Sequence, residues 1–308
     1  MTLHIETPLL ESGAMPVRTG QSVWLKMEAL QPSGSFKLRG IGHACEQYAL
    51  RGARRFVSSS GGNAGIAAAH AGRRLGLPVT VVVPETASSR ARELIRREGA
   101  EIVVHGASFQ EANALAQSML GAQDAFIHPF DDPLLWEGHA SMIDEVARAG
   151  LAPDAVVLSV GGGGLLCGVV EGLRRNGLGA VPVIAVETLG ADSYARSLQA
   201  GERIELPAIG SIATSLGARR VSEHAFELAR RHPVEPVVVS DRAAVEACLR
   251  FMDDHRVVVE PACGAALAVA YRAGEVLARH ERVLAIVCGG VTATVEQLQR
   301  WGRDLPPD

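Results

Sequence analysis

The chain has 308 residues, of which 47% are hydrophobic and 21% are charged, so it is long enough to bury the core of one large or two medium domains. Its formal net charge of −4 gives no electrostatic reason to expect a nucleic acid or an anionic membrane as a partner. We therefore expect a small-molecule function.

Cysteine usage and the lack of long apolar runs indicate the compartment. The cysteines are Cys45, Cys167, Cys248, Cys263 and Cys288. Their odd number and their spacing do not fit a disulfide framework or a structural zinc site. No targeting signal is visible, and no stretch approaches the ~18 consecutive apolar residues that a membrane helix needs. We expect a cytoplasmic protein that contacts no membrane.

The first predicted elements surround a lysine. Residues 22–27 are expected to form a short strand after an irregular entry, and the small residues at 33–35 suit a turn and a helix cap. Apolar residues then recur at helical spacing, so a helix is predicted to begin near Lys37 and to end before Gly52. Taken alone, Lys37 would be read as a solvated charge on this helix.

Apolar runs and helix-length segments alternate along the rest of the chain. The runs that predict strands are residues 55–57, 79–83, 102–104, 125–127, 155–159, 181–186, 237–239 and 283–287. Predicted helices between them include residues 65–75, 89–99 and 262–278. Strands that are buried on both faces and separated by helices indicate parallel sheets. We therefore predict two open α/β units, the first ending near residue 140, with ligands at the strand ends in the cleft between them.

A second stretch with chemical potential, S-S-S-G-G-N-A-G at residues 58–65, lies between a predicted strand and a predicted helix. Its hydroxyls, its glycines and Asn63 present donors at a helix N-terminus, where the partial positive charge favours an anion such as a carboxylate. An ordinary Ser/Asn-capped loop is an equally good reading of this stretch alone.

A third stretch, S-V-G-G-G-G-L-L-C-G at residues 159–168, runs from a strand through four glycines into a helix. The glycines cost backbone entropy but expose a row of amides and let a phosphate approach closely. A dinucleotide site is the alternative, because Glu187 closes the next strand as in a dinucleotide-binding unit. The G-x-G-x-x-G pattern, however, needs glycine where Leu166 or Cys167 stands, so a phosphate site is favoured over a nicotinamide site.

A fourth stretch, V-C-G-G-V-T at residues 287–292, follows the last predicted strand, and a buried structural cysteine is its simplest reading. Together the four stretches offer an amine, an anion-binding loop, a phosphate cradle and a weakly polar thiol, all at strand ends. Pyridoxal phosphate needs a lysine for its aldehyde, glycines for its phosphate, a partner for its ring nitrogen and a clamp for an amino-acid carboxylate.

The sequence resembles the pyridoxal-phosphate enzymes of the tryptophan-synthase β type, and within them the serine/threonine dehydratases of the liver type. The motifs that carry the resemblance are S-G-S-F-K-L-R-G at 33–40, S-S-G-G-N-A-G at 59–65, F-D-D-P-L-L-W-E-G-H-A at 130–140, S-V-G-G-G-G-L-L-C-G-V-V at 159–170, E-P-A-C-G-A-A-L-A at 260–268 and V-C-G-G at 287–290. They cover almost the whole chain in the family's order. The resemblance implies pyridoxal-phosphate fold type II: two open twisted parallel-sheet α/β domains with the cofactor in the cleft between them. Residues 1–37 and 141–308 would form the large domain and residues 38–140 the small one.

The resemblance also implies roles by position. Lys37 would hold the cofactor as a Schiff base and act as the catalytic base, and Phe36 would lie against one face of the ring. Asn63 would bond the ring hydroxyl, and Cys288 would bond the pyridine nitrogen. The phosphate would be bound by Gly161, Gly162, Gly163 and Gly164. The substrate would be bound by Ser60, Gly61, Gly62, Asn63 and Ala64.

A monovalent cation, usually potassium, and a homodimer are further implications of the resemblance. The positions that match the family's cation site are Gly161, Glu187, Ala191, Ser193, Leu216 and Ala218. Glu187 and Ser193 offer hard oxygen ligands, whereas the other positions offer only backbone carbonyls.

The implied reaction is the deamination of L-serine to pyruvate and ammonia by β-elimination, with L-threonine as a second substrate that gives 2-oxobutanoate. A threonine-preferring dehydratase, a serine racemase and a cysteine synthase-like enzyme are alternatives of the same fold, and a catalytically inactive nucleotide-binding module is the distant alternative. Gly61 has no side chain to return a proton from the second face, which argues against a racemase. We also expect Gly61 to leave room for the β-methyl group of threonine. The chain ends soon after its last helix, so no effector-binding domain is expected.

Overall fold

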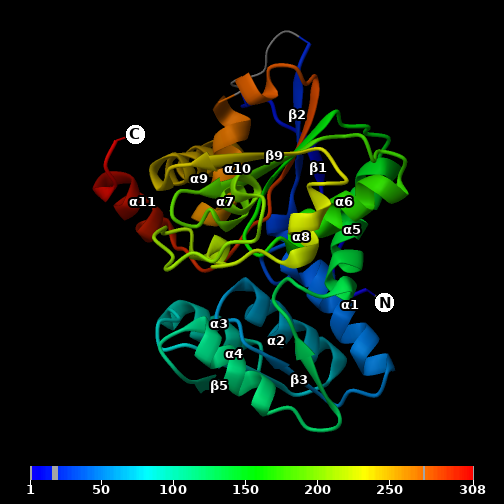
Figure 1. Ribbon diagram of the computed structural model, residues 1–308, viewed down its shortest axis with the longest axis vertical. Helices are drawn as coiled ribbons and strands as arrows, with labels where there is room; N and C mark the ends of the chain where they lie inside the picture. The colour runs from blue at the N-terminus through cyan, green and yellow to red at the C-terminus, as the bar shows by residue number, and fades with distance from the viewer. Residues whose placement is uncertain (1, 16–19, 273–274, 308) are drawn as a thin grey trace.

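The structure is a computed structural model that describes residues 2–15, 20–272 and 275–307. Its strands form a six-stranded sheet and a four-stranded sheet, which lie in the upper and lower parts of Figure 1. Helices cover both sheets, and α1 and α5 run where the two parts meet (Figure 1). This is the predicted arrangement of two open α/β units.

The six-stranded sheet has the order β1-β2-β10-β7-β8-β9. Its strands are β1 (Leu9–Glu11), β2 (Ser22–Lys26), β7 (Ala155–Ser159), β8 (Val183–Thr188), β9 (Val234–Val239) and β10 (Arg282–Ile286). All neighbours are parallel except β1, which pairs antiparallel with β2. Strand β2 lies beside β10, with Val23 opposite Val283, so segments from the two ends of the chain share this sheet.

The four-stranded sheet has the order β5-β4-β3-β6 and is parallel throughout. Its strands are β3 (Arg55–Ser58), β4 (Val79–Val83), β5 (Glu101–Val104) and β6 (Asp124–Ile127). Strand β4 is buried along its whole length, whereas the edge strand β5 has no buried residue. The valine-rich centre of this sheet therefore supplies its core.

Helices connect the strands. The α-helices are α1 (Lys37–Leu50), α2 (Asn63–Leu75), α3 (Ser89–Arg97), α4 (Phe109–Ser118), α5 (Pro133–Arg148), α6 (Gly164–Arg175), α7 (Ser193–Ala200), α8 (Glu223–Leu228), α9 (Asp241–His255), α10 (Pro261–Arg272) and α11 (Val295–Asp304). Short 3-10 helices are η1 (Glu28–Leu30), η2 (Thr214–Leu216) and η3 (Glu275–Leu277). Helix α5 shows a clear start signal: Asp132 accepts the N–H of Leu134 at 2.8 Å, and Pro133 takes the first helical position, where its missing donor costs nothing.

The predicted strands are all present, but three details of the prediction are wrong. The antiparallel β1 falls in a segment predicted to be irregular, because three residues are too few to show a pattern. The helix predicted at 262–278 is shorter: α10 ends at Arg272, and the residues of η3 have 3-10 geometry. Ser33 and Ser35 do not cap α1, whose N-cap is Phe36 without a side-chain hydrogen bond.

The division into domains 1–37 with 141–308 and 38–140 stays a prediction. With these bounds every strand of the four-stranded sheet lies in the small domain, and every strand of the six-stranded sheet lies in the large one. The strand at 22–26 precedes the small sheet in sequence but pairs in the large one.

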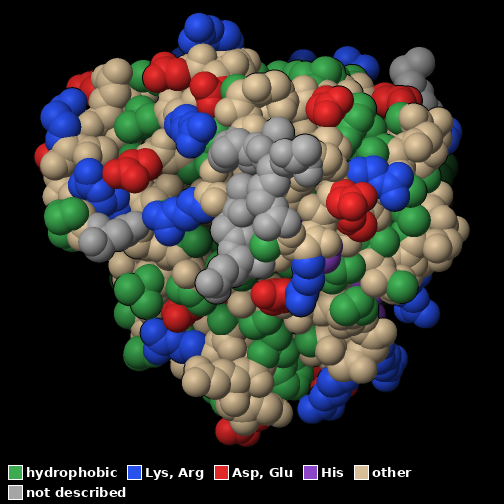
Figure 2. Space-filling view, turned by 90° about the horizontal axis from the view of Figure 1, so that it is seen from above, with side chains coloured by type: hydrophobic (Ala, Val, Ile, Leu, Met, Phe, Trp, Pro, Cys, Tyr) green, Lys and Arg blue, Asp and Glu red, His purple; other side chains and the backbone are tan. Residues whose placement is uncertain are grey.

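Among the described residues, no helix has both the length and the apolar character to cross a bilayer. On the face seen in Figure 2, Lys and Arg side chains are interspersed with Asp and Glu side chains outside the grey atoms. This face carries no broad area of a single charge.

Candidate active site

The turn before Lys37 is bound to the segment that follows β10. The N–H of Phe36 donates to the carbonyl of Cys288 at 3.1 Å, and the N–H of Gly290 donates to the carbonyl of Gly34 at 2.8 Å. Residues from opposite ends of the chain therefore form a small antiparallel bridge beside the lysine. The first and fourth stretches of the sequence analysis meet here.

The amine of Lys37 lies in a desolvated position between the two sheets. Its Nζ donates to the carbonyl of Pro129 at 2.6 Å and lies 5.0 Å from the centre of the Phe36 ring. Burial lowers the pKa of Lys37 from 10.5 to about 8, while the nearby Cys288 and Glu260 act in the opposite direction. A substantial fraction of this amine is therefore neutral, and able to accept a proton, at mildly alkaline pH.

Asn63, the first residue of α2, is held by residues of the large sheet. Its Nδ2 donates to Oε1 of Glu260 at 2.7 Å and to Oγ of Ser215 at 3.3 Å. Its Oδ1 accepts the N–H of Val291 at 3.2 Å. These contacts fix the orientation of the amide and bring the second stretch next to the fourth.

The glycine loop between β7 and α6 packs on an aromatic ring. A Cβ atom on Gly162 would lie 2.3 Å from Cγ of Phe130, and one on Gly164 would lie 2.7 Å from the Phe130 carbonyl oxygen. Gly163 has a φ of 96°, which side chains rarely tolerate. Only glycine therefore fits this close approach. Phe130 directly follows Pro129, so the glycine loop and the Lys37 amine meet the same segment of chain.

The amides of this loop are free to bind an anion. The four N–H groups of Gly161, Gly162, Gly163 and Gly164 donate to no acceptor within the part of the chain that the structure describes. They also lie at the N-terminus of α6, where the helix dipole favours negative charge. The loop has the donors that a phosphate group needs.

The thiol of Cys288 is buried and stays protonated. A hydrogen bond with Cys263 and burial raise the pKa of Cys288 well above its ordinary value. All five cysteines are free and buried. At neutral pH Cys288 therefore offers a weak S–H donor and a weak sulfur acceptor, and no negative charge.

The residues assigned to the substrate form the loop between β3 and α2. They are Ser60, Gly61, Gly62, Asn63 and Ala64. A Cβ atom on Gly61 would lie 2.9 Å from Cβ of Ala87 and 3.3 Å from Cγ1 of Val83. The space that glycine leaves at position 61 is therefore taken up by its own α/β unit, which differs from the extra room beside the substrate expected from the sequence.

Glu187, the central residue of the expected cation site, is fully buried at the end of β8. Its Oε1 accepts the N–H of Tyr194 at 2.9 Å, and its Oε2 accepts the N–H of Ala195 at 2.7 Å. Burial raises the pKa of Glu187 from 4.5 to about 8, although the two N–H groups lower it. A carboxylate in this place gains from a nearby positive charge.

The other expected cation positions are Gly161, Ala191, Ser193, Leu216 and Ala218. A Cβ atom on Gly161 would lie 3.0 Å from Cα of Leu216, so these two backbones are close. The Oγ of Ser193 is buried without a hydrogen-bond partner among the described residues. No cluster of three or more Asp, Glu, His or Cys side chains that would suit a metal ion occurs within the described ranges.

Sequence reasoning missed several residues that contact the site. They are Pro129, Phe130, Ser215, Glu260 and Thr292. The most prominent is Glu260, whose buried carboxylate accepts hydrogen bonds from Asn63 and, at 2.5 Å, from Oγ1 of Thr292. A signal for it exists in the sequence, since a glutamate interrupts the apolar run V-V-V-E-P-A at 257–262.

These features fit pyridoxal phosphate. The amine of Lys37 has a lowered pKa, the glycine loop has free amides in a cradle that any Cβ would fill, and the protonated thiol of Cys288 suits a pyridine nitrogen better than a charged group would. The amide of Asn63 has a second N–H beside the one that it gives to Glu260.

Comparison with known proteins agrees with this fit. Residues 1–289 match the family described as "Pyridoxal-phosphate dependent enzyme". The human protein named "L-serine dehydratase/L-threonine deaminase" is 46% identical over 96% of this chain and 94% of its own length. The mouse protein named "Serine dehydratase-like" is 49% identical over 96% of this chain and 93% of its own length.

A solved structure, a fungal L-serine ammonia-lyase from Rhizomucor miehei, superposes with a TM-score of 0.93 at 34% identity and covers 99% of both chains. The chain therefore belongs to the pyridoxal-phosphate dependent enzymes and has the fold of their type II members.

Proposed function

We propose that the protein deaminates L-serine to pyruvate and ammonia by pyridoxal-phosphate-dependent β-elimination, and that it converts L-threonine to 2-oxobutanoate. The observation that carries the proposal is the amine of Lys37, with its pKa lowered to about 8, beside a glycine loop with free amides and a buried thiol. The names of its relatives support the choice of substrates.

Lys37 has two tasks in this proposal. Its amine binds the cofactor covalently, and after the substrate amine displaces it, the freed amine removes the proton from the substrate Cα. Pyridoxal phosphate supplies an electron sink for the electrons of the broken bond. The carbonyl of Pro129, 2.6 Å from Nζ, directs the amine, and the desolvated site keeps part of it neutral.

The remaining residues bind and orient. The amides of the glycine loop would hold the phosphate, Asn63 would donate to the ring hydroxyl, and Cys288 would face the ring nitrogen with Phe36 against the ring. The hydroxyl of Ser60 and the amides at the N-terminus of α2 would hold the substrate carboxylate. A thiol holds a pyridinium proton less firmly than a carboxylate, which favours rapid loss of the β-hydroxyl over a long-lived carbanion.

A serine racemase is the alternative, and Gly61 argues against it. Racemisation needs an acid on the face opposite Lys37, and position 61 has no side chain to act as one. One carbon more in the substrate changes binding by ~1–3 kcal/mol, so the preference between serine and threonine should be graded.

The test is product release from a panel of L- and D-amino acids, together with chiral analysis of the unreacted serine. We expect pyruvate from L-serine, 2-oxobutanoate from L-threonine and negligible D-serine. The Lys37→Ala variant, with its fold checked by circular dichroism, should lose this turnover because it lacks both the anchor and the base. D-Serine formed as fast as pyruvate would assign the chain to the racemases instead.

Three finer features belong to the same proposal. We infer a monovalent cation, potassium in the first place, near Glu187 and the glycine loop, supported by the buried carboxylate and the unpartnered hydroxyl of Ser193. We also infer a homodimer that works in amino-acid degradation in the cytoplasm. The dimer and the compartment rest on the family resemblance and on the free cysteines.

A further inference from the structure

Arg39 stands two residues after Lys37 in α1 and is completely buried. Its Nε donates to Oε2 of Glu28 at 2.7 Å, and its Nη2 donates to Oε1 of the same carboxylate at 2.8 Å. On its other side, Nη1 and Nη2 donate to the two oxygens of Glu145 at 2.6 and 2.7 Å. The guanidinium is thus bound in a bidentate manner by two carboxylates from different elements.

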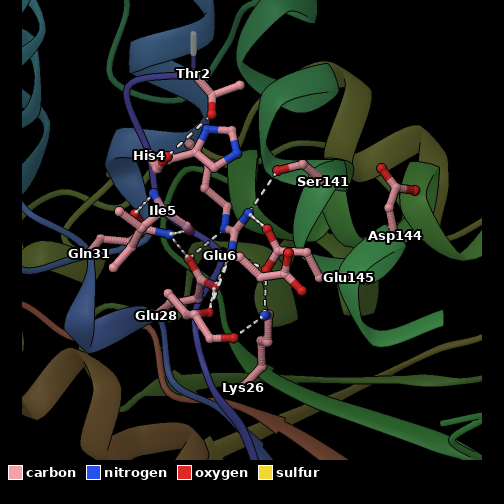
Figure 3. Close-up of polar contacts among 12 residues, drawn as sticks. Thr2, His4, Ile5, Glu6, Lys26, Glu28, Gln31, Ser141, Asp144 and Glu145 are labelled. Carbon is pink, nitrogen blue, oxygen red and sulfur yellow. Dashed lines mark hydrogen bonds and ion pairs between the residues drawn. The ribbon is translucent and has the colours of Figure 1, made fainter. Parts of the chain in front are cut away.

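The cluster around Arg39 is closed and balanced in charge. Lys26 donates to Glu145 at 2.5 Å and to the carbonyl of Thr7 at 2.7 Å, so two cations face two carboxylates. Figure 3 shows Lys26, Glu28 and Glu145 converging, together with Gln31, whose amide donates to Glu28 at 3.2 Å. The cluster, defined as Lys26, Glu28, Arg39 and Glu145, joins β2, η1, α1 and α5.

Stability alone does not account for this cluster. Taking four charges out of water is costly, and apolar residues of similar volume often stabilise a core equally well or better. What the ions add is geometry, because a bidentate guanidinium fixes both the distance and the angle between the elements that it joins. The sequence places this geometry at the first turn of the helix that carries Lys37.

Other contacts hold the same turn against α5. The N–H of Gly40 donates to Nδ1 of His139 at 3.2 Å, and a Cβ atom on Gly138 would lie 2.5 Å from the carbonyl oxygen of Arg39. The Phe36 and His139 rings lie 4.9 Å apart, and Lys37 reaches the carbonyl of Pro129 just before α5. The start of α1 therefore cannot shift along α5 without breaking polar contacts on both sides of Lys37.

We propose that Arg39 is a positioning residue of the reaction: its two carboxylate partners fix the first turn of α1 against α5, and this places Nζ of Lys37 at the cofactor. The proposal rests on the function proposed above. Arg39 itself touches neither substrate nor cofactor. Loss of its partners would leave the substrate loop of the other unit unchanged.

The test compares Glu145→Gln with Asp144→Asn in the cofactor-loaded enzyme. Asp144 is the neighbouring residue in α5, and Figure 3 shows it apart from the cluster; it pairs instead with Arg175 and Asn176 towards the surface. Both variants change a carboxylate to an amide on one helix. The measurements are kcat and KM for L-serine, absorbance above 400 nm, the yield of borohydride-fixed cofactor on Lys37, and Tm.

Glu145→Gln is expected to lower kcat by about 10- to 100-fold, the usual cost of a small misplacement of a catalytic group, while KM stays within about twofold. The absorbance band and the yield of fixed cofactor on Lys37 should fall with it. Asp144→Asn should leave all of these readings near the wild-type values. Equal kcat, KM and absorbance in the two variants would overturn the proposal.

Arg39→Lys covers the case in which Glu145→Gln does not fold. Lysine keeps the charge but cannot bind two carboxylates in a bidentate manner, so we expect a Tm close to wild type, a reduced kcat and a reduced absorbance band. Wild-type kcat and absorbance in this variant would refute the positioning role. If the wild-type enzyme binds the cofactor but releases no pyruvate, the proposed function fails, while the fixed-cofactor yields of the variants still decide the positioning role.

Discussion

Asn63 and Glu260, 197 positions apart in sequence, are joined by a hydrogen bond of 2.7 Å from Nδ2 to Oε1. The bond connects the first residue of α2, beside the small sheet, with the residue before α10, which packs on the large sheet. Both groups are buried, so neither has water as an alternative partner.

The first prediction follows from this bond. Glu260→Ala should lower kcat/KM by about 10- to 100-fold, because a hydrogen bond to a charged group is worth ~1.5–3 kcal/mol and Asn63 would lose its orientation. Glu260→Gln should retain more activity, since an amide oxygen still accepts from Asn63. Thr292→Val is the matched control, because it removes only the donor on the other carboxylate oxygen. A control variant as impaired as Glu260→Ala would show that the Asn63 contact has no special role.

A second prediction concerns pH and the Lys37 amine in protein freed of cofactor. Its pKa is about 8 in the folded chain and 10.5 ordinarily, so between these values the unfolded chain binds more protons and stability rises with pH. Lys37→Met lacks this contribution. The Tm advantage of the variant over wild type should therefore be largest below pH 8 and shrink as the pH approaches 10.5. A difference that stays constant over this range in parallel thermal melts would contradict the lowered pKa.

Gly162→Ala is predicted to weaken cofactor binding. The new Cβ would lie 2.3 Å from Cγ of Phe130, so the ring or the loop must move away from the place where the phosphate is expected. Overpacking of this kind costs ~1–3 kcal/mol, which corresponds to about 5- to 150-fold in affinity. The measurement is titration of the stripped protein with pyridoxal phosphate, followed by absorbance. Gly179→Ala, whose Cβ would have its nearest neighbour at 3.6 Å, is the control and should bind normally.

Two substitutions at Cys288 should differ. Its raised pKa keeps the thiol protonated, and a serine hydroxyl can replace that donor and acceptor, so Cys288→Ser should keep most of the activity. Cys288→Ala removes the polar group and should lose more. Steady-state rates and the position of the cofactor absorbance band distinguish the two cases. Alanine and serine variants with the same rates and spectra would mean that Cys288 only packs.

The proposed cation predicts a pH-dependent stabilisation. Because the pKa of Glu187 is raised from 4.5 to about 8, its contribution to stability is fully present below pH 4.5 and is lost as the pH rises through 8. A bound cation replaces the missing proton. Potassium should therefore raise Tm more at about pH 8.5 than at about pH 6, and more than sodium does. The same shift in a Glu187→Gln variant would exclude this carboxylate as a ligand.

The architecture was predictable because buried parallel strands leave a local signature. Runs such as V-T-V-V-V at 79–83 and A-V-V-L-S at 155–159 match β4 and β7 residue for residue. Strand β1 escaped because three residues that pair only at an edge carry no such signature. The end of α10 was misplaced because an alanine-rich helical pattern does not itself show where a helix stops.

The site was predictable only in part. Glycines, lysine and asparagine at strand ends could be recognised from neighbouring residues, and the structure brings these stretches together. The partners that orient them could not, because a contact such as that of Lys37 with the carbonyl of Pro129 depends on backbone positions 92 residues apart. The same holds for Arg39, whose charge in an amphipathic helix looks like a surface charge until Glu28 and Glu145 are placed beside it.

The pairing of β2 with β10 has a consequence for the order of folding. All four strands of the small sheet are available once residue 127 has been synthesised, so this sheet can form early from contacts that are close in sequence. Strand β2, which leads into the Lys37 turn, must wait for a neighbour that begins at residue 282. The carbonyl of Cys288 that holds Phe36 arrives later still. A ribosome-bound chain would thus carry a formed small sheet while its reactive lysine still lacks the backbone that holds it in place.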